Sequence, residues 1–158
     1  MALVVVILAA CVACDQRSKY LAGEHLRGSD GMSLLADTVR LSYTENQGGF
    51  LGLGASLPAP WRAAAFTVGC SVAIAAILSY TLVAARASYF QILGLSLICA
   101  GGIGNLIDRW AFGCARDFLN VGLGPIRTGI FNVADVALMT GCLLVLLAHR
   151  TRISSKSG

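Results

Sequence analysis

The stretch ASYFQILGLSLICAGGIGNLI, residues 87–107, decides the fold because it carries no charged side chain and is long enough to cross a lipid bilayer. A helix rises about 1.5 Å per residue, so about 20 apolar residues cross the roughly 30 Å of hydrocarbon. Residues 63–85 are also uncharged, and residues 131–148 are apolar beyond their first turn. Residues 3–22 form a fourth candidate with charges in its last turns. The sequence therefore predicts an α-helical integral membrane protein with four transmembrane helices.

The composition of the whole chain indicates lipid as the main solvent. Of its 158 residues, 56% are hydrophobic and 13% are charged, whereas soluble domains carry about 25% charged residues. The net charge of +4 is spread along the chain, without the basic stripe of a nucleic-acid-binding surface. We therefore expect a lipid bilayer, and no nucleic acid, as a partner.

The N-terminal span has a second interpretation as a cleaved signal peptide. Leu8-Ala9-Ala10-Cys11 resembles a lipoprotein cleavage box. A secretory signal has a basic region before its apolar core, and no Lys or Arg precedes Arg17 in this chain. We therefore expect residues 3–22 to be a retained span.

The two long connections, residues 23–61 and 109–130, are expected to fold into one cap. Residues 39–44 alternate apolar and polar side chains, which is typical of a half-buried strand. Residues 117–123 are typical of a second short strand, ended by the turn at Gly124-Pro125. The sequence predicts a small β-rich cap on one face of a single membrane-embedded domain of residues 1–158.

The charges of the short connections favour one orientation. Arg86 and the basic tail after residue 148 stand without acidic neighbours, which suits the cytoplasm. The long connections also hold several basic residues, so this count alone does not decide the orientation. We expect both termini in the cytoplasm and the cap on the extracytoplasmic face.

Four acidic residues lie at or near the predicted span ends: Asp15, Asp108, Asp117 and Asp135. Ionisable groups near hydrocarbon are costly and are candidates for function. Simpler explanations exist for two of them. Asn132 and Asp135 have the spacing of a helix capping box, and Asp15 and Lys19 have the order and spacing of a helix salt bridge.

Asp117 and Asp108 also have neighbours that would explain them. An ion pair with Arg116 would make Asp117 a surface carboxylate, and an ion pair with Arg109 would anchor Asp108 at the membrane interface. Asn105 precedes Arg109 by one helical turn, so the two share a face. The nearby glycines at 101, 102 and 104 allow helices to approach closely and leave room for an extended peptide.

These residues belong to five short segments, which stand in the order DQRSK (15–19), ENQGGF (45–50), GGIGNLIDR (101–109), DF (117–118) and FNVAD (131–135). Together they resemble the motifs D-Q-x-x-K, N-x-G, G-x-x-G-N-x-x-D-R, D-F and F-N-x-A-D of the bacterial lipoprotein signal peptidases (signal peptidase II). The resemblance covers essentially the whole chain. One departure is Phe50, which stands one residue earlier than the aromatic residue of the family segment.

The resemblance implies an aspartic endopeptidase that removes signal peptides from diacylglyceryl-modified bacterial prolipoproteins, cutting on the N-terminal side of the lipidated cysteine. Its catalytic pair would be Asp117 and Asp135, without metal or cofactor. Two close carboxylates share a proton, so one can act as base and the other as acid. The resemblance also implies a bacterial plasma (inner) membrane location and inhibition by globomycin-type cyclic peptides, and we expect a monomer.

The supporting residues implied by the resemblance would bind substrate, tune the catalytic pair or hold the helices: Asp15, Lys19, Asn46, Gly48, Asn105, Asp108, Arg109 and Asn132. Asp15 and Lys19 are expected to fix the first helix against the cap, and Asn132 to orient Asp135 while capping its helix. Arg62 is either an interfacial anchor or a contact for lipid or substrate.

Three other functions fit parts of the pattern. A small transporter would place its acidic residues near the bilayer midplane, often with internal symmetry, whereas here they lie at span ends. A structural subunit would not need Asp117 and Asp135. A metallopeptidase is disfavoured because His25 and His149 are far apart and no H-E-x-x-H motif occurs.

Overall fold

The computed structural model describes residues 2–49, 52–83 and 88–154. Its helices are α1 (Ala2–Leu26), α2 (Ala59–Ala63), the π-helical segment η2 (Ala64–Gly69), α3 (Cys70–Val83), α4 (Tyr89–Phe112) and α5 (Val133–Ser154). Its strands are β1 (Met32–Leu34), β2 (Val39–Asn46), β3 (Ala115–Leu123) and β4 (Ile126–Arg127). The predicted end of the second span at 84–85, the predicted start of the third at 87, and Phe50 lie outside the described residues.

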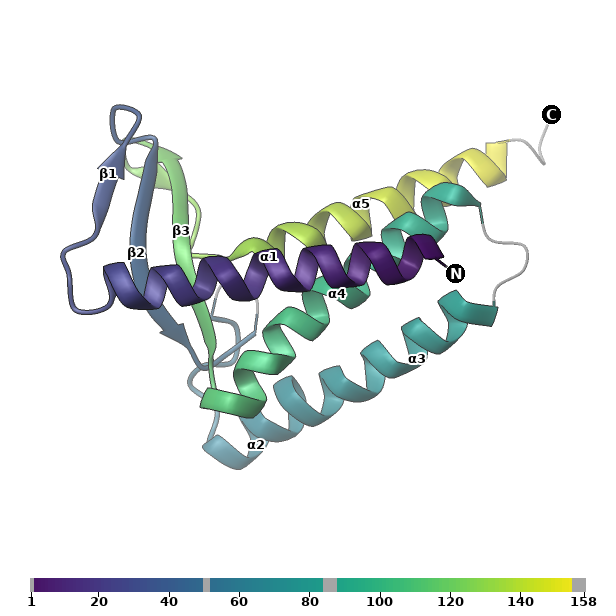
Figure 1. Cartoon of the computed structure of the whole chain (residues 1–158), viewed down its shortest axis with the longest axis horizontal. Helices are drawn as coiled ribbons and strands as arrows, with labels where there is room; N and C mark the ends of the chain where they lie inside the picture. Colours follow the sequence, from purple (N-terminus) through teal and green to yellow (C-terminus); the bar gives the residue numbers. More distant parts are fainter. Residues whose placement is uncertain (1, 50–51, 84–87, 155–158) are drawn as a thin grey trace.

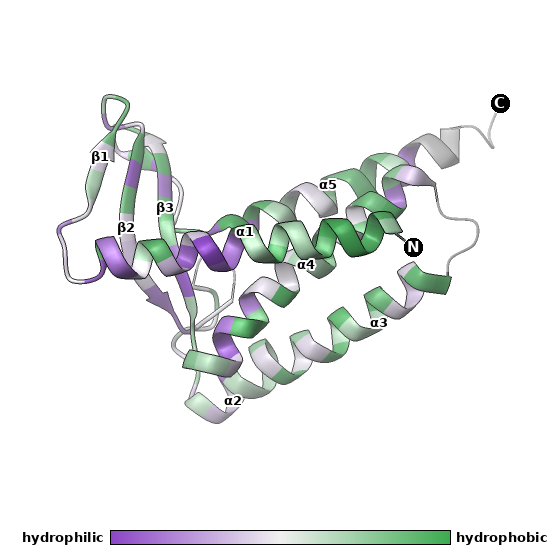
Figure 2. Cartoon of the chain, viewed as in Figure 1, coloured by the Kyte–Doolittle hydropathy of each residue, from purple (hydrophilic) through white to green (hydrophobic). Residues whose placement is uncertain are grey.

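The helices form an elongated bundle with the sheet at one end (Figure 1). The beginning of α1 and the end of α5 lie together at the other end (Figure 1). Hydrophobic residues follow the helices along most of their length, while hydrophilic residues gather toward the sheet (Figure 2). The molecule is therefore divided into an apolar helical part and a polar cap.

Three segments are long and apolar enough to cross a membrane: Ala59–Val83, Tyr89–Phe112 and Val133–Arg150. Their mean hydropathies over 18 residues are 2.0, 1.7 and 1.6, so the protein is a multi-pass membrane protein. Helix α1 is not among them, because every 18-residue stretch of it contains three charged residues, Asp15, Arg17 and Lys19.

Two helix boundaries differ from the predicted spans for local reasons. Helix α2 begins at Ala59, before the predicted start at residue 63, since proline is well accepted in the first turn of a helix and Pro60 lies there. Helix α4 continues past residue 107 to Phe112 and ends at Gly113, whose φ of 75° is the left-handed conformation that glycine adopts readily. The longer α4 carries Asp108 and Arg109 within the helix.

Helices α4 and α5 pack closely along two glycine positions. A Cβ atom on Gly94 would lie 2.8 Å from the carbonyl oxygen of Gly141, and a Cβ on Gly101 would overlap the carbonyl oxygen of Ala134. Small residues at such crossings let the helix backbones approach each other. This close approach holds the first turn of α5 against α4.

The cap is a four-stranded antiparallel sheet in the order β1-β2-β3-β4. Both predicted strands are confirmed as β2 and β3, and the predicted turn at Gly124-Pro125 joins β3 to β4. The register of β2 against β3 shifts between Leu41 and Thr44. Strands β1 and β4 are only three and two residues long, so no alternating pattern could have predicted them.

The sheet is attached to the end of α1 by a small apolar cluster. Phe118 of β3 packs with Ala22 and Leu26 of α1, and Leu41 and Tyr43 of β2 pack against the same cluster. Each of the three central residues is at most 9% exposed. Burial of these side chains fixes β3, and with it Asp117, relative to α1.

Candidate active site

A cavity of about 270 Å³ opens between α3, α4, α5 and the cap. The residues of its polar end are Asn46, Asn105, Arg109, Asp117 and Asp135. The side formed by η2 and α3 is apolar and includes Phe66, Cys70, Ala73, Ile74 and Ile77. The structure thus brings five residues singled out from the sequence to one cavity, although they come from four different segments.

Asp117 lies on β3, with only 2% of its surface exposed. Asn46 Nδ2 donates a hydrogen bond to its Oδ2 at 2.9 Å, and Asn132 Nδ2 donates to its Oδ1 at 2.6 Å. Burial raises the pKa of Asp117 to about 6, against the stabilising effect of these two amide donors and with some help from the charge of Asp135. Asp117 therefore titrates closer to neutral pH than an exposed aspartate does.

Asp135 lies in the first turn of α5 and forms a capping box with Asn132. The backbone N–H of Asp135 donates to Asn132 Oδ1 at 2.9 Å, and the backbone N–H of Asn132 donates to Asp135 Oδ2 at 3.2 Å. Asn105 Nδ2 donates to the other oxygen of Asp135, also at 2.9 Å. The capping interpretation is correct, and the same carboxylate also lines the cavity.

Asn132 connects the two carboxyl groups. Its oxygen caps α5, and its Nδ2 donates both to Asp117 Oδ1 and to Asn105 Oδ1, the latter at 3.0 Å. The side chain is fully buried. One amide therefore sets the position of Asp117 relative to the helix that carries Asp135.

The loop after β2 is tied to α4 through Gly48. Its N–H donates to Asn46 Oδ1 at 3.0 Å, and its carbonyl oxygen accepts from Arg109 Nη2 at 2.5 Å. Arg109 Nε is buried and has no hydrogen-bond partner among the described residues. This loop thus orients Asn46 toward Asp117 and holds Arg109 at the edge of the cavity.

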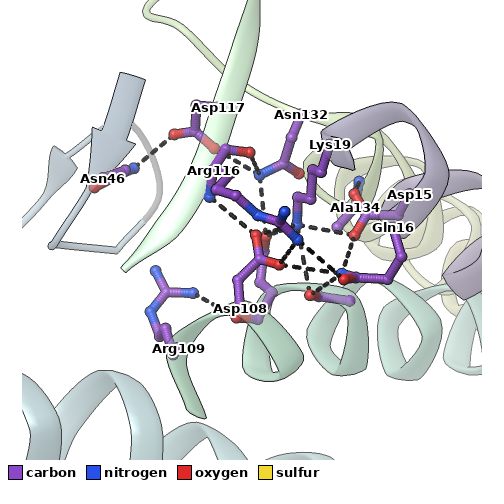
Figure 3. A network of polar contacts seen from close by, with 12 residues as sticks. Asp15, Gln16, Lys19, Asn46, Asp108, Arg109, Arg116, Asp117, Asn132 and Ala134 are labelled. Carbon is purple, nitrogen blue, oxygen red and sulfur yellow. Dashed lines mark hydrogen bonds and ion pairs between the residues drawn. The ribbon is translucent and has the colours of Figure 1, made fainter. Parts of the chain in front are cut away.

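Behind the cavity lies a buried cluster of charged side chains from α1, α4 and β3 (Figure 3). Lys19 Nζ lies 2.8 Å from Asp15 Oδ2 and 3.2 Å from Asp108 Oδ2, with all three residues at most 1% exposed. Arg116 Nη2 lies 2.7 Å from Asp108 Oδ1. Gln16 Nε2 donates to both carboxylates, at 3.1 and 3.3 Å. The cluster contains two negative and two positive charges and is neutral as a whole.

The structure corrects the expected role of Asp15 and Lys19. Their salt bridge is present, but its contacts are with α4 and α5 instead of the cap: Asp15 Oδ1 accepts the N–H of Ala134 at 2.9 Å, and Lys19 Nζ donates to Asn105 Oδ1. The Ala134 N–H belongs to the first turn of α5, which has no acceptor within the helix. A carboxylate at this helix N-terminus is also favoured by the helix dipole.

Both ion-pair explanations for Asp117 and Asp108 are wrong. Successive side chains of a strand point to opposite faces, so Arg116 points away from Asp117 and toward Asp108 (Figure 3). Asp108 pairs with Arg116 and Lys19, whereas Arg109 lies one helix position further and donates to Gly48. Asp108 therefore belongs to the buried cluster, and it does not line the cavity.

The roles of three residues of the site were not predicted from the sequence. Gln16 stands inside the first motif and links Asp15 to Asp108, but no spacing along α1 predicts a contact 92 positions away. Arg116 and Phe66 carry no local signal, because their contacts come from segments remote in the chain.

Arg62 closes the loop before α2. Its Nη1 donates to the carbonyl oxygen of Leu57 at 2.6 Å, and its Nη2 donates to Gln47 Oε1 at 2.8 Å. Arg62 and Arg109 line a second cavity of about 390 Å³ beside the first. Arg62 is thus held by the loop that carries Gly48.

The raised pKa of Asp117 gives a testable dependence of stability on pH. The folded protein binds this proton more tightly than the unfolded chain, whose carboxyl has a pKa of 3.8. Between pH 4 and pH 7 the wild type should therefore lose on the order of 2 kcal/mol relative to Asp117→Asn as the pH rises. Thermal unfolding of both proteins in detergent at pH 4 and pH 7 measures this difference. A difference in unfolding temperature between the two proteins that is the same at pH 4 and at pH 7 would contradict the prediction.

The match to a family model gives an independent comparison. The model described as signal peptidase (SPase) II matches residues 7–150. The lipoprotein signal peptidase of Syntrophus aciditrophicus is 29% identical over 143 residues, covering 90% of this chain and 89% of the relative. That of Halothermothrix orenii is 31% identical over 145 residues, covering 92% and 93%.

Two solved structures share the fold. A bacterial membrane enzyme determined by the in meso method at 2.3 Å resolution has a TM-score of 0.85 at 24% sequence identity, covering 99% of this chain and 92% of that one. A second, determined at 1.9 Å resolution, has a TM-score of 0.77 at 23% identity, covering 94% and 92%. At these identities the comparison shows the fold alone.

Proposed function

Because the chain belongs to the signal peptidase II family, we propose that it removes signal peptides from bacterial prolipoproteins as a membrane aspartic endopeptidase, with Asp117 and Asp135 as the catalytic pair. One observation carries the assignment of the pair. Both carboxyl groups are buried, line the same cavity and are linked through Asn132.

The chemistry follows from two carboxyl groups that share one proton. The charged member accepts a proton from a water molecule as the water oxygen attacks the carbonyl carbon of the scissile bond. The protonated member donates a hydrogen bond to the carbonyl oxygen, and a proton then passes to the leaving amine. Because the pair titrates as a unit, neither residue is assigned a fixed role.

The supporting residues hold this pair and the substrate. Asn46, Asn105 and Asn132 donate to the two carboxyl groups. Arg109 lines the cavity and keeps a buried Nε without a partner among the described residues, so we assign it to the substrate backbone. Asp108 anchors the beginning of β3, since it accepts the backbone N–H of Arg116 at 3.0 Å.

The substrate is a prolipoprotein whose cysteine carries a diacylglyceryl group, and it reaches the cavity within the membrane. The apolar residues of α3 form one wall of the cavity. Within the apolar 18-residue stretch of Ala59–Val83, only 6% of the residues are buried within the protein, so most of this span faces lipid. We assign the apolar wall to the acyl chains and the strand and loop of residues 39–53 to the cut site.

We further assign α1 as a fourth span. Its charges at Asp15 and Lys19 form a buried ion pair, so they do not meet lipid, where they would be costly. Trp61 and Trp110 are 69% and 68% exposed near the cap, as expected of aromatic anchors at a membrane interface. In this topology both termini lie in the cytoplasm, and the catalytic pair lies at the extracytoplasmic face of the bacterial plasma membrane.

The test is cleavage of a purified, diacylated prolipoprotein by the purified wild-type protein in detergent. The matched control is the same precursor with the lipidated cysteine replaced by serine. Mass spectrometry should show a cut directly before the modified cysteine in the first precursor only. A globomycin-type cyclic peptide should block this cut, and the enzyme should act as a monomer. Absence of cleavage by the folded wild type would contradict the proposal.

Gly48 provides a further prediction about the loop that carries Asn46. A Cβ atom at this position would lie 2.5 Å from the carbonyl oxygen of Leu53, so Gly48→Val must displace the loop. We expect kcat/KM to fall about 100-fold, since a shift of about 1 Å in a catalytic group has such an effect. Ser56→Val, at an exposed position of the same loop, is the control. Equal activity of the two variants would exclude this role of Gly48.

A further inference from the structure

The three asparagines around the catalytic pair all face it with their NH2 groups. An amide can be turned either way, so something must fix which end is the acceptor. For Asn46 this is the backbone N–H of Gly48, and for Asn132 it is the backbone N–H of Asp135. Each of these N–H groups can only donate, so the asparagine oxygen must face it and the NH2 group must face the carboxyl groups.

Asn105 differs because two side chains, and no backbone N–H of the described residues, hold its oxygen. Its Oδ1 accepts from Lys19 Nζ at 2.9 Å and from Asn132 Nδ2 at 3.0 Å. A lysine ammonium has three donors and no acceptor. Lys19 Nζ contacts Asp15, Asp108 and Asn105, with a longer contact of 3.5 Å to the carbonyl oxygen of Gly104. Asn105 Nδ2 is therefore directed at Asp135 Oδ1, at 2.9 Å.

We propose that Lys19 is a positioning residue: through Asn105, it fixes which hydrogen-bonding group faces Asp135 of the catalytic pair. Its ammonium holds the Asn105 oxygen, and this keeps the Asn105 NH2 group as a donor to Asp135, a donor that favours the charged carboxylate. The proposal rests on the proposed function, because it assumes that Asp117 and Asp135 perform the reaction. It adds a task for a residue of α1 that does not line the cavity.

Removal of Lys19 has a definite consequence in this arrangement. Without the ammonium, the Asn105 oxygen keeps only Asn132 Nδ2 as a donor among the described residues, and the carboxylate of Asp108 draws the NH2 group of Asn105 away from Asp135. The hydrogen bond that favours the charged form of Asp135 is then weakened. The catalytic pair would then require a higher pH to lose its first proton, so the acid limb of the pH–rate profile would move to higher pH.

The other charged and titratable groups around the pair are accounted for. Helix α1 contributes Asp15 beside Lys19, α4 contributes Asp108 and Arg109, β3 contributes Arg116, and α3 contributes Cys70 in the cavity wall. Arg116 is the matched comparison for Lys19, because it is the second cation on Asp108. Within the described part of the chain, however, its guanidinium bonds to Asp108 and Gln16 and lies over the ring of Phe112, and it makes no contact with Asn105.

The experiment compares acid limbs for cleavage of a synthetic diacylglyceryl-cysteine peptide between pH 4.5 and pH 8. Since Lys19→Met alone leaves a buried negative charge, the wild type is compared with the double variant Lys19→Met/Asp15→Asn, in which the cluster stays neutral, and Asp15→Asn alone shows the effect of that substitution by itself. The amide oxygen that Asp15→Asn introduces can still accept the N–H of Ala134. We expect the limb of the double variant to lie about one pH unit higher, which is a tenfold loss of rate on the acid side.

Two controls separate positioning from a structural role. Arg116→Met removes the same charge from the cluster and should leave the limb in place, even if it lowers the unfolding temperature. Asn105→Ala deletes the directed amide while the ion pairs of Lys19 remain, and it should move the limb in the same direction as loss of Lys19. Infrared difference spectra of the protonated carboxyl band should show the same shift without substrate.

The outcomes distinguish this proposal from the proposed function. No cleavage by the wild type would overturn both. Cleavage by the wild type, with coincident acid limbs for the wild type and the double variant, would overturn only the role of Lys19. An equal shift of the acid limb in Arg116→Met would mean that the charge of the cluster, and not the orientation of Asn105, causes the shift. A shift that is confined to the Lys19 and Asn105 variants supports the proposal.

Discussion

Asp117→Asn and Asp135→Asn should each lower kcat for prolipoprotein cleavage by at least about 1,000-fold, because the loss of either carboxyl group removes general acid–base catalysis. Asparagine is close in shape to aspartate, but it cannot share the proton of the pair. Cleavage of a diacylated prolipoprotein by purified protein, followed by mass spectrometry, measures the loss. Asp30→Asn, the same substitution at an exposed position of the cap, should retain wild-type kcat.

The double variant Asp117→Asn/Asp135→Asn should be little slower than either single variant. Residues that act as a unit are not additive in their effects on catalysis. Losses that multiply in the double variant would indicate two independent roles, and full activity in either single variant would remove that residue from the mechanism. Unchanged circular dichroism and a retained unfolding transition are required for each variant, so that loss of fold is not mistaken for loss of chemistry.

Gly101→Ala should destabilise the protein by about 2–3 kcal/mol and strongly reduce its activity. A Cβ atom on Gly101 would overlap the carbonyl oxygen of Ala134 and lie 3.0 Å from the backbone nitrogen of Leu138. Both atoms belong to the backbone of α5, so the helix itself must move. Asp135 lies directly after Ala134 and moves with it. Thermal unfolding in detergent and the cleavage assay measure the two effects.

The neighbouring glycine provides the control for this prediction. A Cβ atom on Gly102 would meet the end of the Ile74 side chain, which can turn to another rotamer. Alanine is favoured over glycine within a helix by about 1 kcal/mol, so Gly102→Ala should stay within about 1 kcal/mol of the wild type. Equal destabilisation by the two substitutions would mean that backbone contact between α4 and α5 is not what distinguishes Gly101.

Several parts of the site follow from local sequence. The capping box of Asn132 and Asp135 could be predicted because its partners are three residues apart, and the salt bridge of Asp15 and Lys19 because its partners are four residues apart. In both cases helix geometry alone brings the groups together. The partners of Asp117 and Asp108 were predicted wrongly, because adjacency in the sequence was taken as contact, whereas a strand directs adjacent side chains to opposite faces.

The sequence by itself determined the apolar spans, the two longer strands and the resemblance that identifies the chemistry, since these depend on composition and spacing within short segments. The tertiary structure decided which side chains meet. Asn46 reaches Asp117 across 71 positions, and Asp15 reaches Ala134 across 119. Such contacts depend on how closely the helices pack and on where the sheet is attached to α1. For that reason only the folded chain shows that the ion pair of Asp15 and Lys19 lies behind Asp117 and Asp135 and is bonded to α4 and α5 instead of the cap.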